Sequence, residues 1–264
     1  MFRPIRRRLI SLGIVIAVAT SLAACGTVSS PHGELARNKE ILSTCDRAKP
    51  PASLVELDVS GSSLSDAIVK ERMTALTSIV RRTAICSGYL RVSLFSVSSA
   101  NTAALFDGPL HLEGATDSAR LKRVPRVVDE TMTNIRRAYG PTVKSMPTKG
   151  SDVTSVYRLG AEWITQLGSG FRLHLYVFTD GFQTVGVQLG RRALSKQEAI
   201  ALADKTTIPK LPGAAVTVAG LGRVAGSPPP SEVVEGLVAY YTALCRKADA
   251  ATCVSVTDYE AAGQ

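Results

Sequence analysis

The chain has few aromatic residues, few histidines and no paired cysteine motif. Of 264 residues, six are Phe, seven Tyr and one Trp. No Lys/Arg run is interleaved with aromatic residues, which argues against a nucleic-acid-binding surface. His32, His111 and His174 are scattered, and no motif pairs any of them with a nucleophilic Ser or Cys. Because no Cys-x-x-Cys pair occurs, a structural zinc site or a thioredoxin-like site has little support.

The N-terminal residues resemble the signal of a bacterial lipoprotein. Four arginines lie among the first eight residues, and residues 9–19 form an apolar run that is short for a membrane span. Leu22-Ala23-Ala24-Cys25 then resembles a lipobox. The resemblance implies cleavage before Cys25 and lipidation of its thiol, which would hold the protein on the extracytoplasmic face of the cell membrane. An ordinary secretory signal and a signal anchor are the alternatives.

The charge and length of the mature chain indicate one mildly basic domain. Removing the expected signal peptide, residues 1–24, takes away four Arg and no acid, so the formal net charge falls from +9 to +5. This excess is too small to indicate nucleic-acid binding. We expect residues 25–50 to be the lipidated cysteine and a tether, and residues 51–260 to form one domain of about 200 residues with its own core.

The remaining four cysteines are consistent with export. An even number of cysteines outside the cytoplasm suggests two disulfides. Three pairings are possible for Cys45, Cys86, Cys245 and Cys253. We favour Cys245–Cys253, which are close in sequence, and this leaves Cys45–Cys86. Reduced, buried thiols are the alternative.

Apolar runs alternate with longer amphipathic segments along the chain. This alternation predicts an α/β fold, with a doubly wound, mostly parallel central sheet and helices on both faces. A short return segment, 102–106, is expected to be an antiparallel edge strand. The expected strands are 53–58, 89–97, 171–178, 214–219 and 253–256. The expected helices are 64–85, 116–138 (with Pro125 as its weak point), 153–167, 195–205 and 231–247.

The most informative stretch is Asp58-Val59-Ser60-Gly61-Ser62, which follows the first expected strand. Ligands bind in open α/β sheets beyond the carboxyl ends of strands. One carboxylate and two hydroxyls there form an all-oxygen site suited to Mg²⁺, or to Mn²⁺ or Ca²⁺. The same residue types also form ordinary turns and helix caps, so this stretch alone leaves both interpretations open.

The order of elements and three loops resemble a von Willebrand factor type A (vWA) domain, which has a Rossmann-like layout, with a metal-ion-dependent adhesion site (MIDAS). Asp58, Ser60 and Ser62 match the first metal loop, Asp-x-Ser-x-Ser. Asp180-Gly181 matches the third loop, at the end of the fourth strand. The resemblance covers roughly residues 51–258.

The second loop departs from the family pattern. The family has a Thr after a Gly at a helix start, whereas this chain has Ser151 after Gly150. The resemblance implies Ser151 as the ligand, with Thr148 and Thr154 as nearby rivals. The implied metal ligands are therefore Asp58, Ser60, Ser62, Ser151 and Asp180.

Three functions remain open at this level. The resemblance favours a non-enzymatic binding module that holds Mg²⁺ and captures an Asp or Glu of a protein partner. A metal-dependent envelope hydrolase would use the same oxygens to activate water, but no general base and no second metal position can be identified. The third is a structural or solute-binding lipoprotein without a working metal site.

Overall fold

The computed structural model describes residues 31–98 and 101–263. The expected signal peptide, the lipidation site Cys25 and the first part of the tether lie outside the described residues. The first described element is helix α1 (Pro31–Ser43), which precedes the sheet. No helix within the described ranges has both the length and the apolar character needed to cross a membrane.

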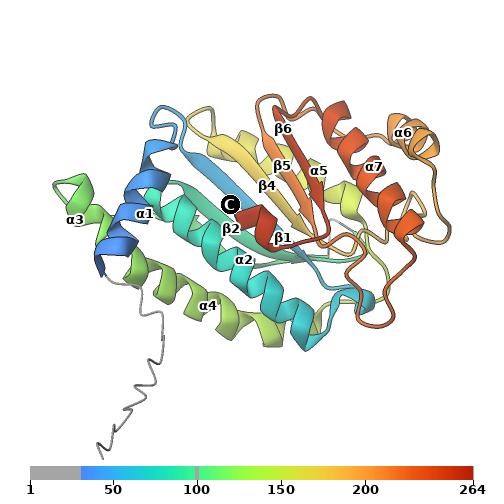
Figure 1. Cartoon of the computed structure of the whole chain (residues 1–264), viewed down its shortest axis with the longest axis horizontal. Helices are drawn as coiled ribbons and strands as arrows, with labels where there is room; N and C mark the ends of the chain where they lie inside the picture. Colours follow the sequence, from blue (N-terminus) through green and yellow to red (C-terminus); the bar gives the residue numbers. More distant parts are fainter. Residues whose placement is uncertain (1–30, 99–100, 264) are drawn as a thin grey trace, which may run out of the picture.

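A six-stranded sheet forms the centre of the domain, in the order β3-β2-β1-β4-β5-β6 (Figure 1). Four neighbouring pairs are parallel, and only β2 and β3 pair antiparallel. The expected α/β fold with one antiparallel edge strand is therefore confirmed. The strands are β1 (Pro51–Asp58), β2 (Tyr89–Phe95), β3 (Thr102–Pro109), β4 (Arg172–Phe178), β5 (Ala215–Ala219) and β6 (Thr252–Val256).

The sheet is covered on both faces by helices, and α2, α5, α6 and α7 begin and end close to the expected positions. On one face, α2 (Asp66–Ile85) and α4 (Val124–Ser145) pack against Val55 and Leu57 of β1. On the other, α5 (Val153–Leu167) and α7 (Ser231–Lys247) share a core with Leu54. All eight residues of β1 are buried, as expected for a central strand with helices on both sides.

Helix α6 (Lys196–Lys205) begins with the expected capping box. The Ser195 hydroxyl accepts a hydrogen bond from the Glu198 backbone N–H, and the Glu198 side chain accepts one from the Ser195 N–H. Two backbone donors at the start of the helix are thereby satisfied. Because β1 and β4 are parallel, the β4–α6 connection lies at the same end of the sheet as the β1–α2 connection.

The expectation of one helix over 116–138 is wrong. The structure has a short helix, α3 (Asp117–Leu121), followed by α4, which continues to Ser145. Pro125 lies in the first turn of α4, where its missing N–H leaves no hydrogen bond unmade. The break therefore falls just before the proline that was expected to weaken the helix.

Both favoured disulfides are present. Cys45–Cys86 links the segment after α1 to the residue after α2, and Cys245–Cys253 links α7 to β6. Their sequence separations are 41 and 8 residues. The first disulfide fastens the N-terminal segment to the domain, and the second fastens the last strand to its neighbouring helix.

Candidate functional site

The candidate site lies where the strand order changes direction. The chain passes from β1 to β2 on one side and later returns to β4 on the other side of β1. The carboxyl ends of β1 and β4 therefore meet beneath loops that diverge, which is the usual ligand position in an open α/β sheet. Asp58 is the last residue of β1, and Asp180 follows the end of β4 by two residues.

Asp58 joins three separate segments of the chain. Its Oδ1 accepts a hydrogen bond from the Ser60 backbone N–H at 2.8 Å. Its Oδ2 accepts from the Ser151 hydroxyl at 3.0 Å and from the Thr179 hydroxyl at 2.6 Å. Asp58 has no exposed surface, so its side chain is held in one orientation.

Asp180 is the second buried carboxylate. Its Oδ1 accepts a hydrogen bond from the Phe182 N–H at 2.9 Å, which shapes the turn after β4. Burial, and then the neighbouring Asp58 charge, raise the pKa of Asp180 to about 6, against the opposing effects of the Ser62 hydroxyl, the Phe182 N–H and Arg72. In the absence of a cation, the site therefore resists holding two ionised carboxylates.

Among the buried side-chain atoms of the described residues that have no hydrogen-bond partner, two are oxygens of the predicted metal ligands, and others, such as the Ser63 hydroxyl, lie close by. The two ligand oxygens are the Ser60 Oγ and the Asp180 Oδ2. Buried polar atoms are almost always paired, so an unpaired atom calls for an explanation such as a missing ion. A divalent cation would satisfy both, and two carboxylates with neutral hydroxyls suit a hard cation such as Mg²⁺. The residues present therefore fit the metal that the sequence suggests.

The first loop is held in place by its backbone. The Ser63 N–H donates to the Ser60 carbonyl at 2.9 Å, and the Ala225 N–H donates to the Ser62 carbonyl at 2.7 Å. The Ser62 side chain is exposed, whereas Ser60 is buried. One hydroxyl of the Asp-x-Ser-x-Ser motif thus lies within the cluster and the other at its open rim.

The three candidate hydroxyls of the second loop differ in burial and in hydrogen bonding. Ser151 is buried and donates to Asp58. Thr148 is exposed, and its carbonyl accepts from the Gly61 N–H at 2.9 Å. The Thr154 hydroxyl donates to Asp152 at 2.8 Å, at the start of α5. Of the three, Ser151 is the one whose hydroxyl is bonded to Asp58.

Glycine is required beside Asp180. Gly181 has φ +82°, and a Cβ at this position would lie 2.6 Å from the Leu221 side chain. Any other residue would therefore strain the backbone and also clash. This explains the Asp-Gly pair of the third loop in terms of local geometry.

Sequence reasoning missed two residues that contact Asp58. Thr179 donates to the carboxylate and accepts from the Gly181 N–H at 3.0 Å, and its place beside Asp180 in the motif could have drawn attention to it. Arg72 of α2 is 1% exposed and donates to the Asp58 carbonyl at 2.7 Å. The available signal for Arg72 was a lone charge on the apolar face of the helix.

The described part of the chain contains no metal-binding cluster of His, Cys, Asp and Glu side chains. Within residues 31–98 and 101–263, no group of three or more His, Cys, Asp or Glu side chains is arranged to hold a metal ion. The candidate site contains two carboxylates and relies on hydroxyls for its other oxygen donors. It is therefore an oxygen site with little negative charge.

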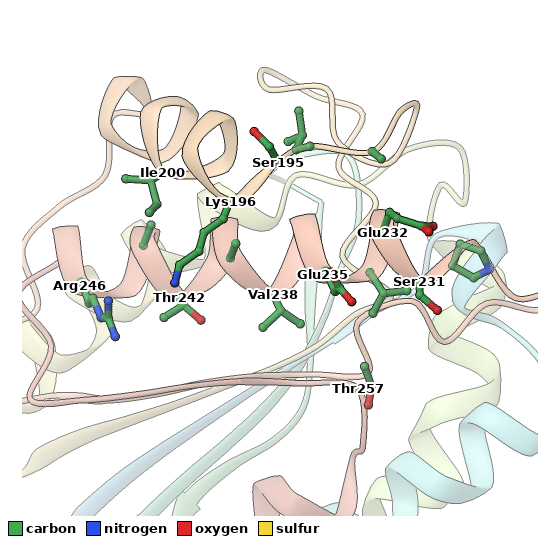
Figure 2. Close-up of a pocket in the computed structure, with 16 residues that line it drawn as sticks. Ser195, Lys196, Ile200, Ser231, Glu232, Glu235, Val238, Thr242, Arg246 and Thr257 are labelled. Atoms are coloured by element: carbon green, nitrogen blue, oxygen red, sulfur yellow. The ribbon is translucent and has the colours of Figure 1, made fainter.

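A groove of about 850 Å³ lies elsewhere, between α6 and α7. Figure 2 shows Lys196 and Ile200 of α6 above Val238 and Thr242 of α7. None of the five predicted metal ligands lines this groove. The polar cluster and the apolar groove are therefore separate features.

Comparisons with known proteins found similar folds only. No protein-family model and no curated protein sequence matches the chain. The solved structures with a similar fold include the three described below, and each identity, TM-score and coverage compares this chain with one of them. BatB, a conserved hypothetical protein from Bacteroides thetaiotaomicron, is 11% identical with a TM-score of 0.46, and the match covers 80% of this chain and 92% of BatB. An aerotolerance-related membrane protein from Bacteroides fragilis is 13% identical with a TM-score of 0.46, covering 80% and 94%.

The pilus adhesin SpaC from Lactobacillus rhamnosus GG, in its open conformation, is 14% identical with a TM-score of 0.44. That match covers 83% of this chain and 29% of SpaC. At these identities and TM-scores, we draw no functional conclusion from the three structures.

Proposed function

We propose that the chain is a divalent-cation-dependent binding module with a vWA-like domain, and that it is not an enzyme. Its metal site would capture an Asp or Glu side chain of a protein partner. The observation that carries the proposal is the pair of buried, unpaired oxygens, Ser60 Oγ and Asp180 Oδ2, beside the fixed carboxylate of Asp58.

The proposed ligands come from three loops that the fold brings together. Asp58, Ser60 and Ser62 follow β1, Ser151 precedes α5, and Asp180 follows β4. The cation, Mg²⁺ or alternatively Mn²⁺ or Ca²⁺, would supply a positive charge with a coordination position left for a carboxylate from outside. Neutral hydroxyls as donors support this role because they leave much of the cation's charge uncompensated.

The proposed location is the extracytoplasmic face of the cell membrane, with a lipid on Cys25 as the anchor. The two disulfides support an oxidising compartment. Metabolic labelling with a radioactive fatty acid tests the anchor, with Cys25→Ser as the control that should not be labelled. Label that persists in Cys25→Ser would show that this cysteine is not the site.

The metal proposal is tested by calorimetric titration of the protein with Mg²⁺ and Mn²⁺, with and without excess acetate as a stand-in for the partner carboxylate. We expect binding that acetate strengthens and that Asp58→Ala abolishes. The matched control is Asp66→Asn, which removes an exposed acid just beyond the first loop and should leave binding unchanged. Absence of binding under both conditions would mean that Asp58 is a structural turn residue.

The partner proposal is tested by capture from envelope extracts in Mg²⁺ and in chelator. A protein retained in Mg²⁺ by the wild type, and lost both in chelator and in Asp58→Ala, would support metal-dependent capture. Equal retention in chelator would favour a scaffold that works without metal. Hydrolysis of a generic ester that is lost in Asp58→Ala would instead favour an enzyme.

A further inference from the structure

A second polar cavity lies at the opposite end of the sheet from Asp58. It has a volume of about 80 Å³ and is bounded by the start of β1, the start of β4 and the C-terminal part of α2. Pro51 and Ser53 of β1 line it, whereas Asp58 ends the same strand. The Cys45–Cys86 disulfide forms part of the wall and fixes the α1–β1 connection against α2.

Positive charge exceeds negative charge around this cavity. Three cationic side chains line it, from Lys49, Arg82 and Arg172, together with one acid, Asp46. Arg82 donates to the Thr44 hydroxyl at 3.2 Å and forms no ion pair with a carboxylate of the described residues. Arg82 is therefore available to an anionic ligand.

Asp46 neutralises the cavity only weakly. Its Oδ2 lies 3.9 Å from Arg172 Nη2, which is beyond hydrogen-bond distance. Its Oδ1 already accepts hydrogen bonds from the backbone N–H groups of Ala48 and Lys49, at 3.0 and 3.1 Å. The guanidinium group of Arg172 therefore keeps most of its hydrogen-bonding capacity.

The inner wall presents hydrogen-bond donors. His174 and Tyr176 of β4 both line the cavity, with their ring centroids 6.4 Å apart. Burial, and then the charges of Arg82 and Arg172, lower the pKa of His174 to about 4. The imidazole is therefore neutral at neutral pH and offers one N–H, beside a phenol and two guanidinium groups.

We infer that this cavity, the Arg82–Arg172 pocket, binds a small phosphate-type oxyanion. Guanidinium groups bind such anions through paired, charge-assisted hydrogen bonds. One water needs about 10–15 Å³ of cavity volume, so a pocket of about 80 Å³ has room for an ion of a few heavy atoms. The same chemistry would accept inorganic phosphate or the phosphomonoester headgroup of an anionic lipid.

Titration of the full chain with inorganic phosphate at constant ionic strength, set with chloride, tests the inference. Calorimetry is expected to show one saturable site. Arg82→Ala and Arg172→Ala should each weaken it about tenfold or more, since each removes charge-assisted hydrogen bonds. The matched control is Arg137→Ala, which removes an equal charge from an exposed position on α4 and should bind like the wild type.

Histidine NMR provides a readout that a folding defect would not imitate. Bound phosphate would offset the field of the two arginines, so the pKa of His174 should rise on phosphate addition in the wild type and in Arg137→Ala. His174→Gln identifies the signal among the three histidines of the chain. A His174 pKa that phosphate leaves unchanged would overturn the inference, even if calorimetry detected heat.

Vesicles containing phosphatidic acid distinguish the two sources of the anion. Arg172-dependent binding of free phosphate without Arg172-dependent vesicle binding assigns a soluble anion. Arg172-dependent vesicle binding assigns the lipid headgroup. If neither probe shows a dependence on Arg172, the pocket does not bind phosphate-type anions and the inference is wrong.

Discussion

Replacing Asp180 by Asn should stabilise the metal-free protein while removing its response to metal. Burial and the charge of Asp58 raise the pKa of Asp180 from 3.8 to about 6. Each pKa unit corresponds to about 1.4 kcal/mol, so ionised Asp180 costs the metal-free fold about 3 kcal/mol. Asparagine keeps a side-chain oxygen to accept the Phe182 N–H but carries no charge. At pH 8 in chelator, the variant should therefore be about 3 kcal/mol more stable.

The stability difference between the wild type and Asp180→Asn should depend on pH. A carboxyl group with a raised folded-state pKa binds its proton more tightly in the folded protein, so its contribution to stability is present below the unfolded-state pKa and is lost as pH rises. The free energy of unfolding of the wild type should thus fall, relative to Asp180→Asn, between pH 4 and pH 7. Urea denaturation at several pH values in chelator measures this difference.

Added Mg²⁺ should reverse the order of stability. The wild type gains the free energy of binding, which grows as RT ln(1 + [Mg²⁺]/Kd), whereas Asp180→Asn gains little. A variant that is less stable than the wild type at pH 8 in chelator would refute the electrostatic reasoning. A stability difference that does not change with pH would refute it as well.

Three further predictions concern His174, the two disulfides and Thr179. The pKa of His174 is lowered to about 4, so between pH 6.5 and pH 4 the unfolded chain takes up a proton on this residue and the folded protein does not. The wild type should therefore lose up to about 3 kcal/mol more stability over this range than His174→Gln does. Urea denaturation of both proteins at several pH values tests this, and an equal loss of stability in the two would contradict it. Removing the Cys45–Cys86 disulfide, which joins residues 41 apart, should lower the free energy of unfolding by about 4 kcal/mol through chain entropy. Removing Cys245–Cys253, which joins residues 8 apart, should lower it by about 2.5 kcal/mol. A larger loss for Cys245–Cys253 in urea denaturation would contradict the chain-entropy argument. Thr179→Val removes a hydrogen bond to the buried Asp58 carboxylate and one from the Gly181 N–H, and it should cost about 2–4 kcal/mol. Thr154→Val also removes two hydrogen bonds, one to Asp152 and one from the Gln183 amide, but these are only partly buried and the variant should cost about 1–2 kcal/mol. Equal losses in thermal unfolding would show that the Asp58 hydrogen bond contributes no more than a partly buried one.

The parts of the site that could be predicted from the sequence are those whose residues lie close together in the chain, directly after an apolar strand. Asp58, Ser60 and Ser62 lie within five residues after an apolar strand, and Asp180 follows another such strand. A strand of buried residues and its exit loop are recognisable without knowledge of the rest of the chain. The turn interpretation of Asp58 could be weighed only after its three hydrogen bonds were known.

The remaining parts depend on contacts across long separations. Ser151 could not be distinguished from Thr148 and Thr154 by sequence, because what distinguishes it is a hydrogen bond across 93 residues to Asp58. Arg72 was missed because the helical pattern of α2 treats it as an interruption of an apolar face. Both are positioned by tertiary packing, which local patterns do not record.

Arg72 sets the net charge of the site. Two buried carboxylates, Asp58 and Asp180, lie near one buried guanidinium, which donates to the Asp58 backbone carbonyl and is also stacked over the Tyr259 ring at 5.2 Å. The group as a whole carries one negative charge when both acids are ionised. Addition of a divalent cation would leave it with one positive charge in a low-dielectric setting, where interactions between charges are strong. Without Arg72, the loaded site would be neutral overall. The buried arginine therefore gives a physical reason why a single carboxylate from a partner, and not a neutral group, would complete the site.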